Sequence, residues 1–167
     1  MKTAHSRRAT ARQAAVLLAA ALAAGSARQV LLPGRIPWRQ DWSDYISSQA
    51  RAAGLRVVDG AAAAAAVRAR SALVLDARPL RAYDRGRVPG ALPLPADDRD
   101  RHLRALLPAL EPGHPLLVYC SGRTCDDGLQ VGRVLAKNGF TDVALYIGGY
   151  DDWRRRGGAV EGGRARP

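Results

Sequence analysis

The chain has 167 residues, of which 47% are hydrophobic and 25% charged, and its formal net charge is +11 at pH 7. This length suits one compact domain with an appendage, and this composition suits a packed core and excludes a wholly disordered chain. Two cysteines are too few for a disulfide scaffold. The three histidines show no ligand spacing around either cysteine, so the sequence predicts no metal site.

Most of the positive charge comes from arginine, since lysine occurs only at Lys2 and Lys137. Four basic residues and no acidic residue precede position 28, which leaves 22 basic against 15 acidic residues, or +7, in the remainder. These arginines are scattered and are not interleaved with aromatic residues, as a groove for single strands requires. We therefore expect a solvated basic surface and no nucleic-acid partner.

The N-terminal segment, residues 1–32, has the pattern of an export signal or a membrane anchor. Residues 13–27 carry no charge, follow a basic stretch and end in small residues, which is typical of a cleaved signal peptide. Fifteen residues rise about 22 Å in a helix, less than the roughly 30 Å of a hydrocarbon core. The apolar residues 30–32 follow Arg28, so an uncleaved anchor that contacts the membrane through residues 13–32 stays open.

Both interpretations place the rest of the chain in the periplasm or another extracytoplasmic compartment, because the basic flank stays inside. An amphipathic or cytosolic start is the third alternative. Residues 33–54 are expected to form a connector. Two prolines favour an extended chain over residues 33–43, and residues 44–54 predict a short helix that is capped at Asp44 and ends at Gly54.

Short apolar runs then alternate with helical segments. Four runs predict strands, at residues 55–58, 72–76, 115–119 and 143–147. Two segments predict helices: residues 61–70, which are rich in alanine, and residues 126–138, which have an apolar face. This order implies parallel strands with helices on both faces, and ligands in such sheets bind beyond the carboxyl ends of the strands. The loop after Tyr119 is therefore the most informative segment.

Cys120 stands in this loop, at the end of a buried strand and before a helix. Unpaired backbone N–H groups and the helix dipole favour an anion there, so we expect the pKa of the Cys120 thiol to fall from about 8.5 toward 3.5–7.5. Gly122 lets the backbone curl, and Arg123 adds positive charge for the thiolate or an anionic substrate. The alternative is that both cysteines are buried small apolar residues.

Several motifs occur in the order that is found in one known family. They are LDAR at 75–78, GRVPGA at 86–91, VYC at 118–120, GFTDV at 139–143 and GGYDDW at 148–153. With them, residues 55–163 resemble a single rhodanese-like (sulfurtransferase) domain, which leaves residues 164–167 as a tail. The resemblance implies a three-layer α/β/α fold with a central, mostly parallel sheet of about five strands. The resemblance and the N-terminal segment together indicate an exported or membrane-anchored, single-domain subset of the family.

By this resemblance, Cys120 takes a sulfane sulfur from thiosulfate, a polysulfide or a persulfide, and passes it as a persulfide to a thiol or to cyanide. Covalent catalysis of this kind divides the transfer into two easier steps and implies no metal or cofactor. The resemblance assigns substrate binding to the loop residues Ser121, Gly122, Arg123, Thr124 and Cys125. It assigns supporting roles to Asp76, Arg78 and Asp126, the first two as a hydrogen-bonded pair that holds the loop.

The sequence also departs from the family pattern. Cys125 stands where Arg or Thr is frequent, and Arg87 stands where the turn usually has histidine. Asp126 and Asp127 are expected to cap the helix, but they place negative charge near an anion site, which disfavours thiosulfate and leaves a persulfide or a protein thiol as the partner.

Two cysteines five positions apart also suggest redox chemistry. Cys120 and Cys125 could form a disulfide, or Cys125 could resolve a persulfide or sulfenate on Cys120, unless the loop holds the two sulfurs apart. A thiol–disulfide redox or sensing module without sulfur-transfer turnover is therefore the alternative function. A phosphatase of the C-x5-R type is excluded, because position 126 is aspartate.

Overall fold

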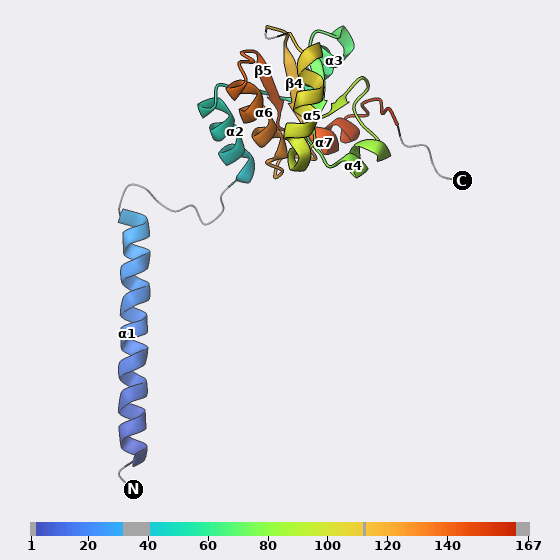
Figure 1. Cartoon of the computed structure of the whole chain (residues 1–167). Helices are drawn as coiled ribbons and strands as arrows, with labels where there is room; N and C mark the ends of the chain where they lie inside the picture. The colour runs from blue at the N-terminus through green and yellow to red at the C-terminus, as the bar shows by residue number, and fades with distance from the viewer. Residues whose placement is uncertain (1–2, 32–40, 112, 163–167) are drawn as a thin grey trace, which may run out of the picture. The chain divides into compact units, whose positions relative to one another are not determined.

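The computed structural model describes residues 3–31, 41–111 and 113–162. The chain divides into two compact units, Met1–Gln40 and Asp41–Pro167. Within the first unit, helix α1 (Thr3–Leu31) covers most of the predicted signal or anchor segment (Figure 1). No helix in the described ranges combines the length and the apolar character that a membrane crossing demands. Most of the predicted extended connector, residues 33–40, lies outside the described residues, as does the tail.

The second unit is built on a five-stranded parallel sheet with the strand order β1-β5-β4-β2-β3. Its strands are β1 (Arg56–Val58), β2 (Leu73–Asp76), β3 (Leu92–Pro93), β4 (Leu116–Tyr119) and β5 (Val143–Tyr146). Its helices are α2 (Trp42–Ala52), α3 (Gly60–Ala69), α4 (Leu80–Arg85), α5 (Arg99–Leu106), α6 (Asp127–Lys137) and α7 (Gly149–Arg155). Two 3-10 turns complete it, Ala96–Asp98 and Leu107–Ala109. The predicted fold class and strand count are confirmed.

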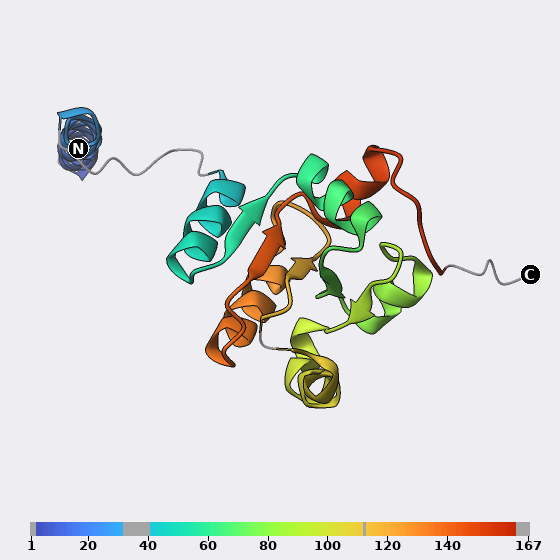
Figure 2. The ribbon, with the colours of Figure 1, turned by 90° about the horizontal axis from the view of Figure 1, so that it is seen from above.

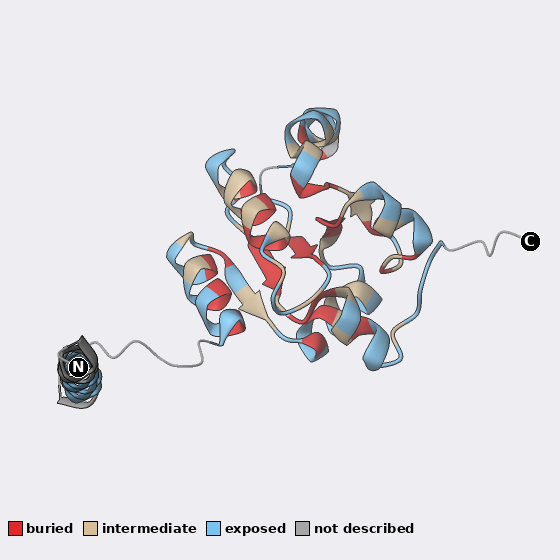
Figure 3. Ribbon diagram, turned by 90° about the horizontal axis from the view of Figure 1, so that it is seen from below, coloured by how far each residue is buried: buried red, intermediate tan, exposed pale blue. Residues whose placement is uncertain are grey.

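Helices cover both faces of this sheet, and alternate residues of each strand point to opposite faces (Figures 2 and 3). In β4, Leu116 and Val118 join one core cluster, which includes side chains from α2, α5 and α6. Leu117 and Tyr119 join the other cluster, which includes side chains from α3 and α7. Cys120 continues the alternation onto the first face, so the pleat of β4 directs this side chain toward α6.

Helix α2 belongs to the same compact unit as the sheet, and it contributes the buried Ile46 and Ala50 to the core. The predicted cap at Asp44 is wrong, because the helix begins three residues earlier. Asp41 has an extended backbone and its carboxylate accepts from the backbone N–H of Ser43 at 2.9 Å, so Asp41 is the N-cap. Asp44 lies in the first turn, where its charge meets the positive end of the helix dipole.

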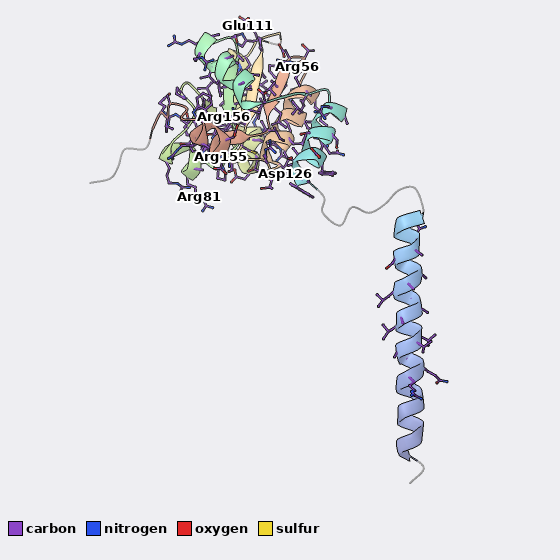
Figure 4. All side chains as sticks on the ribbon, turned by 180° about the vertical axis from the view of Figure 1, so that it is seen from behind. Arg56, Arg81, Glu111, Asp126, Arg155 and Arg156 are labelled. Carbon is purple, nitrogen blue, oxygen red and sulfur yellow. The ribbon has the colours of Figure 1, made fainter. Side chains whose placement is uncertain are left out.

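The exposed arginines lie on separate parts of the domain surface, as the positions of Arg56, Arg81 and Arg155 show (Figure 4). Some of them have acidic partners. Arg56 pairs with Asp142 at 2.6 Å, and Arg155 lies 3.5 Å from Asp152. The positive charge of this unit is thus distributed and partly compensated.

Candidate active site

The loop that joins β4 to α6, residues 120–126, lies at the carboxyl end of the central strands and is held there by the start of α7. The backbone N–H of Tyr150 donates to the carbonyl of Cys120 at 2.8 Å. The next N–H, that of Asp151, donates to the carbonyl of Ser121 at 2.9 Å. Since α7 follows β5 directly, two adjacent strands together determine the position of this loop.

Gly149 makes this contact between α7 and the loop possible. Its φ of +61° lies in the left-handed region, which favours glycine. A Cβ at this position would lie 2.5 Å from the carbonyl oxygen of Cys120 and 2.8 Å from the backbone nitrogen of Gly122. The backbone of α7 therefore approaches the loop as closely as only a glycine permits.

Cys120 is the inner of the two cysteines, with only 3% of its surface exposed. Its thiol donates to the carbonyl of Cys125 at 3.1 Å and lies 3.7 Å from the carbonyl oxygen of Gly122. The backbone N–H groups of Gly122 and Gly128 also face the sulfur and favour its anion. Main-chain donors of the kind that we expected are therefore present at the start of α6.

The expected lowering of the Cys120 pKa is nevertheless wrong. The hydrogen bond to the Cys125 thiol raises the pKa of Cys120, and burial raises it further. The N–H groups of Gly122 and Gly128 act in the opposite direction but do not compensate for these two causes. Sequence reasoning missed this because it treated Cys120 alone, whereas the structure places a second ionisable sulfur against it.

Cys125 is the outer cysteine, half-buried, and its pKa is lowered. The main cause is the hydrogen bond from the Cys120 thiol, supported by the backbone N–H groups of Ser121 and Asp127. Burial and the Asp127 carboxylate oppose it, and Oδ2 of Asp127 lies 3.3 Å from the Cys125 sulfur. The first negative charge of the coupled pair therefore resides on Cys125, and both cysteines are free thiols.

The side chains around the mouth of the loop are mostly exposed and acidic. Asp126 occupies the N-cap position of α6, but its carboxylate accepts from the side chain of Gln130 at 3.1 Å and not from a described backbone N–H, so the expected cap at this residue is wrong. Sequence reasoning did not identify Asp151. Its carboxylate lies beside Gly122, because its Oδ2 would be 3.1 Å from a Cβ added to that glycine. Its only signal was its place in the GGYDDW motif, five residues after a strand end.

Arg123 is exposed and points toward the start of α2. Its charge contributes to lowering the pKa of Asp41, although the hydrogen bonds from Ser43 are the larger cause. Together with Asp41, Asp59 and Arg51, it lines a cavity of about 520 Å³ beside the loop. Ser121 and Thr124 are exposed on the loop surface, so of the predicted loop residues the structure brings Gly122 and Cys125 against the Cys120 sulfur.

Asp76 and Arg78 support the loop from the opposite face of the sheet, as a buried ion pair with a 2.6 Å contact. The predicted hydrogen bonding between the two residues is present, and their supporting role at the site stays a prediction. Tyr119 donates to Oδ2 of Asp76 at 2.5 Å, and the guanidinium of Arg78 lies 3.9 Å from the centre of the Tyr150 ring. Arg78 also donates to the carbonyl of Gly86 at 2.7 Å. The network links the ends of β2 and β4 to α7, and so fixes the residues on either side of Cys120.

Comparisons with known proteins agree with this geometry. Residues 60–156 match the Rhodanese-like domain family. A Bacillus halodurans protein is 24% identical, with 71% of this chain and 85% of that chain covered and a TM-score of 0.56. A protein from an Anabaena species is 25% identical, with 63% and 91% covered and a TM-score of 0.55.

A thiosulfate sulfurtransferase from Pseudomonas aeruginosa is 23% identical, with 75% of this chain covered and a TM-score of 0.56. This chain spans only 24% of that enzyme's length. At these identities, the three solved structures show that this chain shares their fold. Because the family match extends over more than half of the chain, this protein belongs to the rhodanese-like domain family.

Proposed function

We propose that this protein is a sulfurtransferase in which Cys120 carries the transferred sulfur as a persulfide. The observation that carries the proposal is the place of Cys120, at the junction of β4 and α6, with the N–H groups of Gly122 and Gly128 turned toward its sulfur. Such donors stabilise an anion at the start of a helix. Membership of the rhodanese-like family supports the same chemistry.

The reaction has two steps. The Cys120 thiolate attacks the outer sulfur of the donor, an S–S bond forms, and the rest of the donor leaves with the electron pair of its broken bond. An acceptor thiolate or cyanide then attacks the outer sulfur of the persulfide, which restores the Cys120 thiolate. Each step replaces one bond to sulfur by another, which is the advantage of covalent catalysis.

Cys125 assists the first step of this scheme as a base. The raised pKa of Cys120 means that its thiol keeps its proton in the resting site, where it donates to the backbone carbonyl of Cys125. Because Cys125 ionises first, the proton can pass from Cys120 to Cys125 as a donor arrives. Cys125 then activates the nucleophile in the way that a neighbouring base activates serine or cysteine in other enzymes.

The charges around the loop favour a persulfide over thiosulfate as the donor. Asp127 lies 3.3 Å from the Cys125 sulfur, Asp126 belongs to the same loop, and Asp151 lies beside Gly122. The charge of Arg123 acts on Asp41. A thiosulfate dianion is repelled by these carboxylates more strongly than a donor of lower charge. A low-molecular-weight or protein persulfide is therefore the preferred donor, and a thiol is the preferred acceptor.

Mass spectrometry of the reduced protein after exposure to thiosulfate or glutathione persulfide tests this function. We expect one added sulfur atom on Cys120, and no adduct or transfer to a thiol acceptor in Cys120→Ser. Thr141→Ala, at an exposed position that precedes β5 and lies outside the loop, should behave as the wild type. Transfer that persists in Cys120→Ser would contradict the proposal.

A thiol–disulfide module without sulfur turnover is the second candidate, and the 3.1 Å approach of the Cys120 sulfur to the backbone of Cys125 favours it. The two functions differ in one measurement. A redox module would form the 120–125 disulfide with an oxidant such as oxidised glutathione, but would neither accept nor transfer sulfane sulfur.

We also propose that the protein is exported, as a soluble periplasmic form or through an anchor. The charge-free residues 13–27 after a basic stretch support this. The intact mass of the protein recovered from cell fractions tests it. A chain shortened near residue 27 indicates a cleaved signal, and a full-length chain in the membrane fraction indicates an anchor. A full-length chain in the cytosolic fraction would contradict export.

A further inference from the structure

The two cysteines of the loop have different positions relative to solvent. Cys120 is buried, whereas Cys125 is half-buried and lies nearer the solvent. A turn produces this arrangement, because the N–H of Cys125 donates to the carbonyl of Gly122 at 3.0 Å and so folds the chain back. The loop therefore brings the two cysteines together instead of holding them apart, because the Cys120 sulfur lies 3.1 Å from the Cys125 carbonyl oxygen.

This position gives Cys125 access to a sulfur that an external thiol reaches poorly. A persulfide on Cys120 has an inner sulfur, which remains buried, and an outer sulfur, which came from the donor. Attack on the outer sulfur transfers it, whereas attack on the inner sulfur releases it as sulfide. Cys125 already lies against the inner sulfur, which is 3.1 Å from its carbonyl oxygen, and the Asp127 carboxylate lies 3.3 Å from the Cys125 sulfur.

We propose, on the basis of the sulfurtransferase function above, that Cys125 is a resolving thiol that releases sulfide from the Cys120 persulfide. The Cys125 thiolate attacks the inner sulfur of Cys120, the Cys120–Cys125 bond forms, and the outer sulfur leaves as hydrosulfide with the electron pair of the broken bond. The sulfane sulfur is reduced, and the two cysteines are oxidised to a disulfide. An external dithiol of the protein-reductant class then reduces this disulfide and restores both thiols.

Two reactions of the Cys120 persulfide therefore compete. An acceptor thiol in excess removes the outer sulfur, and the site acts as a transferase. In the absence of an acceptor, Cys125 closes the disulfide and the site yields sulfide. The supply of acceptor thiol thus determines the product. When no acceptor is present, disulfide formation prevents the persulfide from persisting on Cys120.

A single-turnover assay without reductant tests this proposal, since a dithiol would release sulfide directly from any persulfide. Reduced wild-type protein, Cys125→Ser and Thr141→Ala are each mixed with thiosulfate and, separately, with glutathione persulfide. Sulfide is measured against a protein-free control, and peptide mass mapping locates persulfides and disulfides. Thr141 is the control position, because it is exposed, precedes β5 and lies outside the loop that carries the two thiols.

We expect the wild type and Thr141→Ala to release one sulfide per protein molecule and to acquire the 120–125 disulfide. Cys125→Ser lacks the neighbouring base, so it should form the Cys120 persulfide more slowly, but it should then keep the persulfide and lose the sulfide burst. A wild-type protein that keeps a stable Cys120 persulfide and transfers it without disulfide formation would overturn this inference and leave the sulfurtransferase function intact. If the wild type forms neither a persulfide nor the 120–125 disulfide and releases no sulfide, and Cys125→Ser forms no persulfide, the function and the inference are overturned together.

Discussion

Cys120 and Cys125 are chemically identical, yet their surroundings give their pKa values opposite directions. Cys120 lies deeper and faces a second sulfur, so its charged form is disfavoured. Cys125 is closer to solvent and accepts a hydrogen bond from Cys120. Environment thus assigns the base to one thiol and the nucleophile to the other, as it does for pairs of titratable groups in other active sites.

The pH dependence of cysteine alkylation tests this assignment. In the wild type, the Cys125 thiolate forms first and opposes a second charge on Cys120. Serine at position 125 stays neutral, so the pKa of Cys120 should fall and its iodoacetamide rate profile should move to lower pH. Cys120→Ala removes the hydrogen-bond donor of Cys125, so the profile of Cys125 should move to higher pH. Shifts in the same direction would contradict the coupling.

The charge of Asp127 should influence which donor the protein accepts. Its carboxylate lies 3.3 Å from the Cys125 sulfur, where it repels an anionic donor. Removing about 1 kcal/mol of such repulsion corresponds to roughly a fivefold change in rate, so Asp127→Asn should accelerate persulfide formation from thiosulfate by about that factor. Asp142→Asn is the control, because Asp142 precedes β5 at the opposite end of the sheet. An equal acceleration in both variants would exclude a local effect.

At the scale of elements, the start of α7 acts as a rigid support for the loop that follows β4. Two consecutive backbone N–H groups of α7 bond to the carbonyls of Cys120 and Ser121, and a glycine permits the approach. Because these bonds join backbone to backbone, they position the loop independently of which side chains it carries. The geometry of the thiol pair therefore depends on the packing of a separate element.

Gly149→Ala tests this support, and Gly157→Ala is its matched control. Both glycines have positive φ, +61° and +74°, so both alanine variants incur about 1–2 kcal/mol of backbone strain. An added Cβ at Gly157 meets no described atom within 4 Å, whereas at Gly149 it would strike the Cys120 carbonyl. Gly149→Ala should therefore lose persulfide formation and more unfolding free energy than the control in urea denaturation. Equal losses would contradict the close approach.

The buried pair of Asp76 and Arg78 connects β2, β4 and α7 in the same way. Removing one partner leaves an uncompensated buried charge, so Arg78→Ala should cost about 3–5 kcal/mol of unfolding free energy. The exposed pair of Arg56 and Asp142 is the comparison, and Arg56→Ala should cost at most about 1 kcal/mol. Chemical denaturation of both variants measures this difference, and similar costs would show that the buried network is not structural.

At the scale of the whole molecule, the compact unit begins at Asp41 and includes α2. This helix contacts β1 and α6 and buries Ile46 and Ala50 against the core. A fragment of residues 41–167 should therefore unfold with the same free energy as the full chain. Within that fragment, Ile46→Ala should cost about 2–5 kcal/mol, whereas Ser48→Ala at an exposed position should cost almost nothing. An Ile46→Ala fragment as stable as its parent would show that α2 is dispensable.

The sequence by itself determined the central strands, the alanine-rich helix and the position of Cys120, because apolar runs and turn residues are local signals of periodicity. Only the tertiary structure decided three other features. The two-residue strand β3 lies in a proline-rich stretch, which argues against a strand, and it exists because β2 offers a pairing edge. The N-cap at Asp41 and the pKa order of the two cysteines depend on which groups the folded chain brings within hydrogen-bonding distance. Periodicity is encoded in neighbouring residues, whereas burial and charge are properties of the assembled fold.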